Sequence, residues 1–130
     1  MDASDIDRPD VLAEVTRCFH AYERALMAND VAALDAFFWA DPRVTRYGIA
    51  DRQLGDAALR AFRAAACAPT FTRTLHALRI TTWGTDMAVA QVEFRRSDTP
   101  LRGFQTQTWA RLPQGWRIVA AHVSMIPMDD

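Results

Sequence analysis

The feature that most constrains the fold of this chain is a pair of strand-like segments near its end, Leu101–Leu112 and Trp116–Ile126, separated by a Pro-Gln-Gly turn. Segments rich in β-branched and aromatic residues on both sides of a turn signal predict a β-hairpin. Polar residues nevertheless recur deep inside both segments, at Gln105, Gln107, His122 and Ser124. A half-buried strand turns such residues towards water, whereas a strand that lines a cavity turns them into it, and both interpretations stay open.

The register of this hairpin decides which polar residues share a face, because a slip of one residue moves every side chain to the other face. A two-residue turn places Gln107 opposite His122 and Gln105 opposite Ser124, which makes one polar face. A three-residue turn that includes Pro113 instead gives His122 and Ser124 two other partners, Thr106 and Thr108. The sequence favours neither register.

Three helices are predicted before these strands. Apolar residues recur at three- and four-residue steps from Pro9 to Ala28, which is typical of an amphipathic helix, and Asp7 is placed to cap it. Asp30 can cap a second helix that ends before Asp41-Pro42, and a third is expected over Ala57–Cys67. Strands are predicted over residues 44–48, 72–83, 87–96, 101–112 and 116–126.

This order of elements indicates the α+β class, with helices packed on one face of a mostly antiparallel sheet. It reads as two helices, a strand with a short companion strand, a third helix and four long strands. Long antiparallel strands twist and curl, so a curled sheet under helices encloses a cone-shaped pocket. The length of 130 residues and a hydrophobic content of 50% fit a single domain over residues 1–130.

The charge balance excludes several classes of partner. The chain has 15 basic and 16 acidic residues and a net charge of −1, so we expect no binding to nucleic acid or to anionic membranes. The start of the chain has no signal-peptide pattern, and we expect a cytoplasmic protein. The two cysteines and three histidines have no metal-ligand spacing, and phosphate-loop and HExxH motifs are absent from the sequence. We therefore expect neither a metal nor a cofactor.

Two residues are candidates for chemistry. Tyr22 lies on the apolar face of the first helix with Phe19, so its hydroxyl is either a satisfied core group or a donor to a substrate. Arg46 alternates onto the same strand face as Val44. If that face is buried, Arg46 needs an anion, either a ligand carboxylate or a protein group such as Asp41.

Aromatic residues supply the walls of a possible pocket. Trp39, at the end of the second helix, and Trp109, on the first strand of the hairpin, are expected in the core or in the pocket wall. Glu93 lies on a strand and is either a partner for an arginine or a general base.

The chain resembles the AtzH-like (HpxZ-like) family, which lies within the NTF2-like superfamily of cystatin-like, SnoaL-type folds. The resemblance extends over nearly the whole chain and rests on eight short segments: Arg8-Pro9, Tyr22-Glu23, Asn29-Asp30-Val31, Phe38-Trp39, Arg46-Tyr47-Gly48, Phe62-Arg63, Gln105–Trp109 and Gly115–Ser124.

The resemblance implies a cone-shaped α+β barrel that forms a homodimer through the outer face of its sheet. It also implies a role in degrading small urea-derived carboxylates, beside a pathway amidase, with Tyr22 and Arg46 as the reactive pair. Two residues depart from the family pattern. Phe104 stands where an arginine is expected, which would change how a dianionic substrate is held, and Asp51 stands where glutamate is more usual.

We therefore expect a small cofactor-free hydrolase or decarboxylase of an N-carboxylated urea, most concretely 1,3-dicarboxyurea going to allophanate. Arg46 would hold a carboxylate and Tyr22 would protonate nitrogen or position water. The predicted substrate-binding residues are Trp39, Gln107, Trp109 and His122. One alternative is a dehydratase or isomerase with Asp41 or Glu93 as base. Another is a non-catalytic ligand-binding or accessory subunit of an amidase.

Overall fold

A computed structural model describes residues 1–128, and over this range the chain forms three α-helices and six strands. The helices are α1 (Pro9–Ala28), α2 (Val31–Phe37) and α3 (Asp56–Ala65), preceded by a short 3₁₀ helix, η1 (Ala3–Asp5). The strands are β1 (Thr45–Tyr47), β2 (Arg52–Leu54), β3 (Arg73–Trp83), β4 (Met87–Arg96), β5 (Arg102–Leu112) and β6 (Gly115–Ile126).

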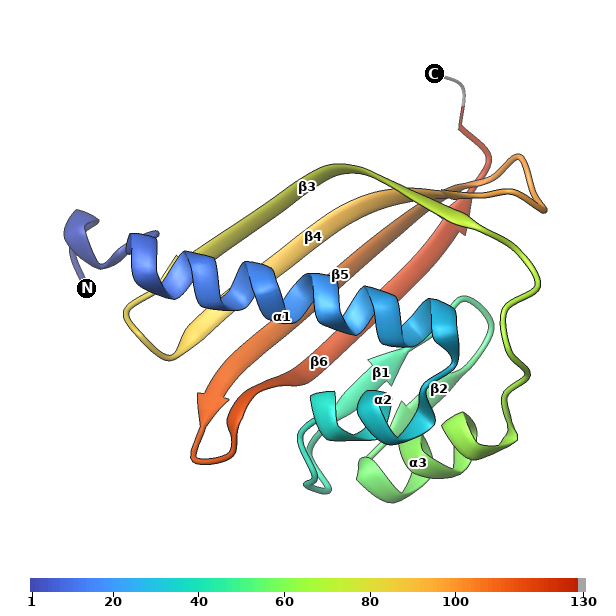
Figure 1. Cartoon of the computed structure of the whole chain (residues 1–130), viewed down its shortest axis with the longest axis horizontal. Helices are drawn as coiled ribbons and strands as arrows, with labels where there is room; N and C mark the ends of the chain where they lie inside the picture. The colour runs from blue at the N-terminus through green and yellow to red at the C-terminus, as the bar shows by residue number, and fades with distance from the viewer. Residues whose placement is uncertain (129–130) are drawn as a thin grey trace.

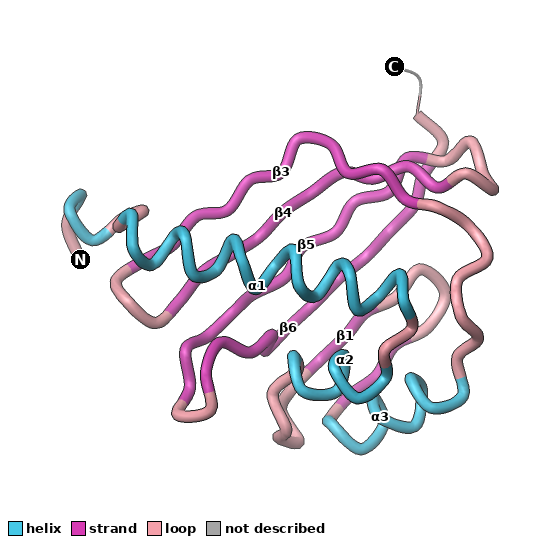
Figure 2. The backbone as a smooth tube through the Cα atoms, viewed as in Figure 1, coloured by secondary structure: helices cyan, strands magenta, loops and turns pink. Residues whose placement is uncertain are grey.

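The six strands form one curved sheet in the order β2-β1-β6-β5-β4-β3. Every neighbouring pair is antiparallel except β1 and β6, which run parallel. All three helices lie on the same face of this sheet, with α1 crossing the long strands and α2 and α3 beside β1 and β2 (Figures 1 and 2). The predicted α+β class is confirmed. The short strand β2 occupies the place of the predicted short companion strand.

The helix boundaries follow local backbone chemistry. Pro9 begins α1 as predicted, but the prediction that Asp7 caps it is wrong, because Arg8 occupies the capping position. Asp7 instead accepts a hydrogen bond from the backbone nitrogen of Thr82 and thereby ties the start of the chain to β3. Asp30 does cap α2, since its carboxylate accepts from the nitrogen of Ala33.

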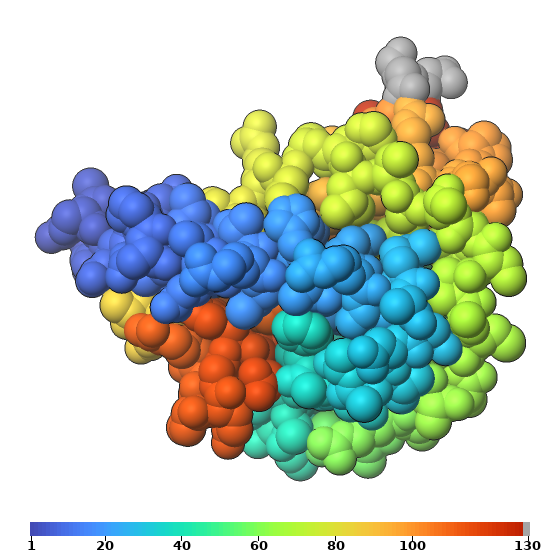
Figure 3. Space-filling model, in the orientation of Figure 1, coloured from blue at the N-terminus to red at the C-terminus, as the bar shows by residue number. Residues whose placement is uncertain are grey.

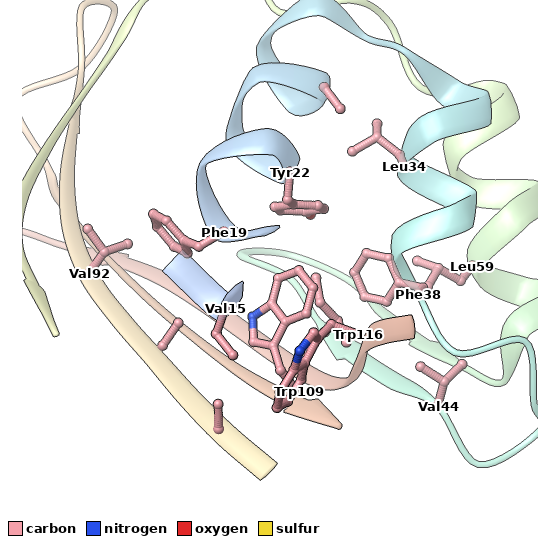
Figure 4. Packing of buried hydrophobic residues seen from close by; sticks show 14 of the residues in the cluster. Val15, Phe19, Tyr22, Leu34, Phe38, Val44, Leu59, Val92, Trp109 and Trp116 are labelled. Carbon is pink, nitrogen blue, oxygen red and sulfur yellow. The ribbon is translucent and has the colours of Figure 1, made fainter. Parts of the chain in front are cut away.

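The core lies between α1 and the sheet. Val15, Phe19 and Tyr22 point from α1 towards the strands, and Phe38 and Leu59 close the space from the side of α2 and α3 (Figure 4). The spacing of the α1 residues is the one read from the sequence. In the space-filling view, α1 and α2 cover the middle of the sheet and leave the β5–β6 turn emerging below α1 (Figure 3).

The β5–β6 hairpin adopts a register that neither simple turn describes. Leu112 pairs with Gly115, so Pro113 and Gln114 form the turn, and the register shifts between Thr108 and Trp109. His122 then pairs with Thr106, as the second alternative predicted, while Ser124 pairs with Phe104. The first alternative is wrong. Because of this register, the two glutamines Gln105 and Gln107 are buried beneath the helices, whereas the side chain of His122 is exposed.

Candidate functional site

A cavity of about 160 Å³ lies at the junction of α1, α3 and the inner face of the sheet. Its volume is below the roughly 300–1,000 Å³ of pockets for drug-sized ligands, so it suits a small molecule. Apolar residues such as Leu26, Phe71 and Phe94 form part of its wall. The polar side chains among its lining residues are two tyrosines, four arginines, two glutamines and one histidine: Tyr22, Tyr47, Arg46, Arg63, Arg73, Arg96, Gln105, Gln107 and His122.

A short hydrogen bond between two lining residues of this cavity joins Tyr22 to Arg63. Nη2 of Arg63 donates a hydrogen bond of 2.9 Å to the hydroxyl oxygen of Tyr22, and both residues are buried. Edge-on contacts with the rings of Phe37 and Phe38 hold the tyrosine ring in place. An arginine can only donate, so the hydroxyl oxygen is the acceptor and its own O–H remains to donate elsewhere.

Arg63 has no carboxylate partner within the described residues, and its Nε is buried without a hydrogen bond. Its guanidinium group instead lies near the rings of Phe38 and Phe62. A buried charge is costly unless it is paired with an opposite charge. Arg63 therefore gives this end of the cavity an uncompensated positive charge.

Arg46 lies at the same end and is held by the β1–β2 hairpin. Its Nη1 donates to Asp51 Oδ1 at 3.0 Å and to Gln53 Oε1 at 2.9 Å, and Gln53 in turn donates to Asp51. Its guanidinium group lies 4.8 Å from the centre of the Phe62 ring. Burial lowers the pKa of Arg46, and the nearby charge of Arg63 lowers it further.

Gly48 makes this arrangement possible. A Cβ atom at this position would lie 2.3 Å from Asp51 Oδ1 and 2.8 Å from Arg46 Nη1. Any larger residue would push the carboxylate and the guanidinium group apart. The sequence Arg46-Tyr47-Gly48 is therefore matched to the ion pair that orients Arg46.

Arg73, on β3, differs from Arg63 in having a carboxylate partner. Its Nε lies 2.9 Å from Glu23 Oε1, a buried ion pair that is not aligned as a hydrogen bond. The guanidinium group stacks 4.0 Å from the centre of the Phe94 ring. Burial lowers the pKa of Arg73 and raises the pKa of Glu23, while each partner's charge opposes the shift of the other.

Phe94 can support Arg73 because β5 has a glycine beside it. A Cβ atom at Gly103 would lie 2.2 Å from the Phe94 ring. The pair Phe94↔Gly103 is directly opposite in the β4–β5 ladder, so the ring rests on bare backbone. Replacement of Gly103 would displace the ring and, with it, Arg73.

The two glutamines have their orientations fixed by neighbours that can only donate. The indole nitrogen of Trp109 donates to Gln107 Oε1 at 3.1 Å, and Arg73 Nη2 donates to Gln105 Oε1 at 3.2 Å. The amide nitrogens are then left as free donors. Nε2 of Gln105 is buried without a partner in the described part of the chain.

Apart from the exposed Tyr47 and His122, the polar lining of the cavity therefore consists of hydrogen-bond donors. Guanidinium groups, amide nitrogens and a tyrosine O–H all face it, and no aspartate or glutamate is among its lining residues over the described range. Such a lining is complementary to an oxygen-rich anion with carboxylate or carbonyl groups. It offers a proton donor but no carboxylate base.

The structure brings Tyr22, Arg46 and Gln107 together at this cavity, with His122 at its exposed edge, and places Trp39 and Trp109 elsewhere. Trp39 does not line it: its ring lies against Arg43, on the far side of Phe38. Trp109 is fully buried and does not line the cavity, but its indole nitrogen donates to Gln107 and its ring contacts Phe37, which in turn packs against Tyr22. His122 borders the mouth, but its exposed ring contacts Tyr47.

The carboxylates considered as bases also lie away from the cavity. Asp41 pairs with Arg43 at the surface, and this bond lowers the pKa of Asp41. Glu93 pairs with Arg102. Phe104 pairs with Ser124 in the ladder and does not line the cavity, so its substitution for arginine does not change the lining directly.

Sequence reasoning missed Arg63 and Arg73 as site residues. Arg63 follows Leu59 by four residues on α3, and both are buried, so it occupies a core-facing position of an amphipathic helix. Arg73 lies two residues before Leu75 on β3, so strand alternation puts both side chains on the inner face. An arginine at a position where the pattern expects an apolar residue is the signal that would have found both.

Within residues 1–128, no group of three or more histidine, cysteine, aspartate or glutamate side chains is arranged to hold a metal ion. In the same range, none of the helices combines the length and the apolar character that crossing a membrane requires.

Comparison with known proteins identifies relatives. A protein of unknown function from Pectobacterium atrosepticum, of the DUF3225 family, is 48% identical, covers 97% of this chain and 98% of its own, and superposes with a TM-score of 0.94. A cystatin-like fold protein from Burkholderia xenovorans is 49% identical over 95% of this chain and 98% of its own, with a TM-score of 0.92. No curated protein is a significant match.

More distant structures share the fold alone. A putative ketosteroid isomerase from Parabacteroides distasonis is 18% identical, covers 97% of this chain and 99% of its own, and has a TM-score of 0.72. The neighbours include NTF2-like and cystatin-like proteins, which agrees with helices packed on one curved sheet. The AtzH-like family model matches residues 4–129, and the chain belongs to the AtzH-like family.

Proposed function

We propose that this protein is a cofactor-free enzyme that removes the carboxyl group of an N-carboxylated urea, most concretely converting 1,3-dicarboxyurea to allophanate. The dianion takes up one proton and releases CO₂, which leaves the monoanion allophanate. The C–N bond to the departing carboxyl breaks, its electron pair stays on nitrogen, and a proton binds there. This reaction needs no metal and no redox partner.

The observation that supports the proposal best is the uncompensated guanidinium group of Arg63 beside the Tyr22 hydroxyl in a cavity lined by donors. A buried cation without a protein anion is stabilised when a ligand supplies the anion. Arg46, which shares the Phe62 ring with Arg63, adds a second guanidinium group at the same end. The substrate is therefore expected to carry at least one carboxylate.

The charges that move during the reaction suggest which carboxylate the arginines hold. Loss of CO₂ transfers negative charge from the departing carboxylate to the urea nitrogen and, by delocalisation, to the urea oxygen. Donors placed at those atoms lower the barrier, whereas an arginine on the departing group stabilises the starting state instead. Arg46 and Arg63 are therefore assigned to the carboxylate that stays.

In this proposal Tyr22 delivers the proton. Because Arg63 already donates to its oxygen, the O–H of Tyr22 is free to point at the substrate, and the guanidinium group lies beside the oxygen that becomes negative. The amide of Gln107 is available for the urea oxygen. The cavity lining includes no carboxylate base within the described residues, and the imidazole of its one histidine, His122, is exposed and contacts Tyr47, which favours decarboxylation over attack by an activated water.

A coupled assay tests this proposal. 1,3-Dicarboxyurea is generated in place by a carboxybiuret amidase, and its loss is followed with and without the protein. We expect faster loss with the wild type, and a decrease of about 100-fold or more with Tyr22→Phe, the range for removal of a general acid. Arg46→Ala should raise KM most strongly, because it removes a carboxylate clamp.

Arg52→Ala is the matched control, since Arg52 is an exposed arginine of the same hairpin that does not line the cavity. Loss at the spontaneous rate in every sample would contradict the proposal. It would favour a non-catalytic ligand-binding or amidase-accessory role, in which the ligand binds without turnover. The homodimer and the amidase partner stay predictions, which light scattering and co-purification test.

A further inference from the structure

A second pair of arginines lines the same cavity on its far wall. Arg73 and Arg96 are directly opposite each other in the β3–β4 ladder, and both line the cavity. Each is stacked on an aromatic ring, Arg73 at 4.0 Å from the centre of Phe94 and Arg96 at 3.7 Å from the centre of Phe71. Like charges that face each other across a strand pair are destabilising, so this arrangement needs a compensating interaction.

The two arginine pairs, Arg46/Arg63 and Arg73/Arg96, lie at opposite ends of the cavity. In the sheet, β6 and β5 separate β1 from β4. At about 4.8 Å per strand, β1 and β4 are about 14 Å apart along the curved sheet, and long side chains reach inward from both. Gln105 and Gln107, on β5, lie between the pairs.

The two ends differ in charge balance. In the pair Arg46/Arg63, Arg46 pairs with the carboxylate of Asp51, and Arg63 has no carboxylate partner within the described residues. Arg73 pairs with Glu23, and Arg96 forms two hydrogen bonds with Asp98, at 2.9 and 2.6 Å, so the second pair is neutralised. Within the described residues, Nη1 of Arg73 and Nη1 of Arg96 have no protein partner, which leaves each of them able to donate.

We propose that the cavity is a two-ended site for a small dicarboxylate, with one carboxylate at Arg46/Arg63, a central hydrogen-bond acceptor at the glutamine amides, and the second carboxylate at Arg73/Arg96. The choice of the end that loses its carboxyl group rests on the proposed function. The binding of a dicarboxylate at both ends does not. The neutralised end holds its carboxylate less firmly. It is therefore the end from which a carboxyl group departs with the smaller penalty.

Binding of two unreactive acids of similar size tests the second subsite. Glutarate has two carboxylates and butyrate has one, and neither is an N-carboxylated urea. By calorimetry with the full chain, we expect glutarate to bind at least about tenfold more tightly than butyrate, as one added charge-assisted contact implies. Arg96→Gln should remove this preference and leave the affinity for butyrate unchanged.

Two further variants make the result specific to Arg96. Arg95→Gln is the matched control, because Arg95 is the adjacent residue on β4 and alternation turns it to the opposite face. Asp98→Asn removes the exposed partner of Arg96, so it should strengthen binding of glutarate but not of butyrate. Asp98→Asn also keeps the test valid if Arg96→Gln fails to fold.

Equal affinities of wild type for the two acids, or equal losses for both with Arg96→Gln, would overturn the second subsite. The outcome is separable from the proposed function. A protein that prefers glutarate but turns over no N-carboxylated urea would retain the two-ended site and lose the reaction. One that turns over the urea without this preference would retain the reaction and lose the second subsite.

Discussion

Arg63 and Arg73 line one cavity and are both buried against aromatic rings, yet they have different partners. Arg73 faces the carboxylate of Glu23, at 2.9 Å. Arg63 faces only the neutral hydroxyl of Tyr22. A buried ion pair must offset the loss of hydration of both its members, whereas a lone buried cation has nothing to offset that loss until an anion arrives. The difference suggests that Arg73 serves the fold as well as the site, and that Arg63 serves the ligand.

Removal of Arg73 should have the largest effect on stability. Arg73→Met leaves Glu23 buried without its partner, and breaking a buried pair in this way costs about 3–5 kcal/mol. Urea denaturation at neutral pH measures the change. Arg79→Met, an exposed arginine on the same strand, is the control and should change stability by less than about 0.5 kcal/mol. A loss below about 1 kcal/mol for Arg73→Met would show that the pair is not structural.

Replacement of Arg63 should give the opposite result. Arg63→Met removes an unpaired buried charge, so we expect the stability without ligand to stay within about 1 kcal/mol of wild type. The stabilisation by a saturating dicarboxylate, about 2.7 kcal/mol at 100 times Kd, should largely disappear. Thermal unfolding with and without glutarate measures both quantities. A large loss of stability without ligand would make Arg63 a structural residue like Arg73 and would remove the difference between them.

The sequence predicted the parts of this site that follow regular periodicity. The three- and four-residue spacing on α1 placed Tyr22 beside Phe19, and strand alternation placed Arg46 on the face of Val44. Both arguments depend only on the geometry of one element. The same periodicity places Arg63 four residues after Leu59 on the buried face of α3, so the local pattern contained the signal for this residue as well.

Other parts depend on contacts that no local pattern contains. The register of the hairpin depends on the turn at Pro113 and Gln114 and on the shift between Thr108 and Trp109, which together place His122 opposite Thr106. The ion pair of Arg73 joins a helix to a strand 50 residues later in the chain, and its support by Phe94 requires a glycine on a third strand. Trp39 follows the end of α2, where helical periodicity no longer fixes the direction of a side chain. Such facts come from tertiary packing.

The smallest expected effect is the change of stability with pH that the titration of Glu23 causes. The sign of this change tells whether burial or the charge of Arg73 has the larger influence on the pKa of Glu23. Burial raises the pKa of Glu23 above its ordinary value of 4.5, and Arg73 and His20 lower it. If burial prevails, the folded protein keeps a proton on Glu23 at pH values where the unfolded chain has lost it. The contribution of Glu23 to the free energy of unfolding then falls as pH rises from 4.5 through the raised pKa.

Glu23→Gln should remove this component of the pH dependence. Urea denaturation of wild type and variant across pH 4.5 to 7 measures it, with the slope rather than the absolute stability as the readout, because the variant also leaves Arg73 unpaired. The carboxylates with lowered pKa, Asp2, Asp41 and Asp98, lose their contributions only as pH falls below about 3.8, outside this range. If the free energy of unfolding instead rose with pH more steeply in wild type than in Glu23→Gln, the attraction of Arg73 would outweigh burial. Arg73 would then hold Glu23 as a full carboxylate, and the Arg73/Arg96 end of the cavity would stay neutralised across pH 4.5 to 7.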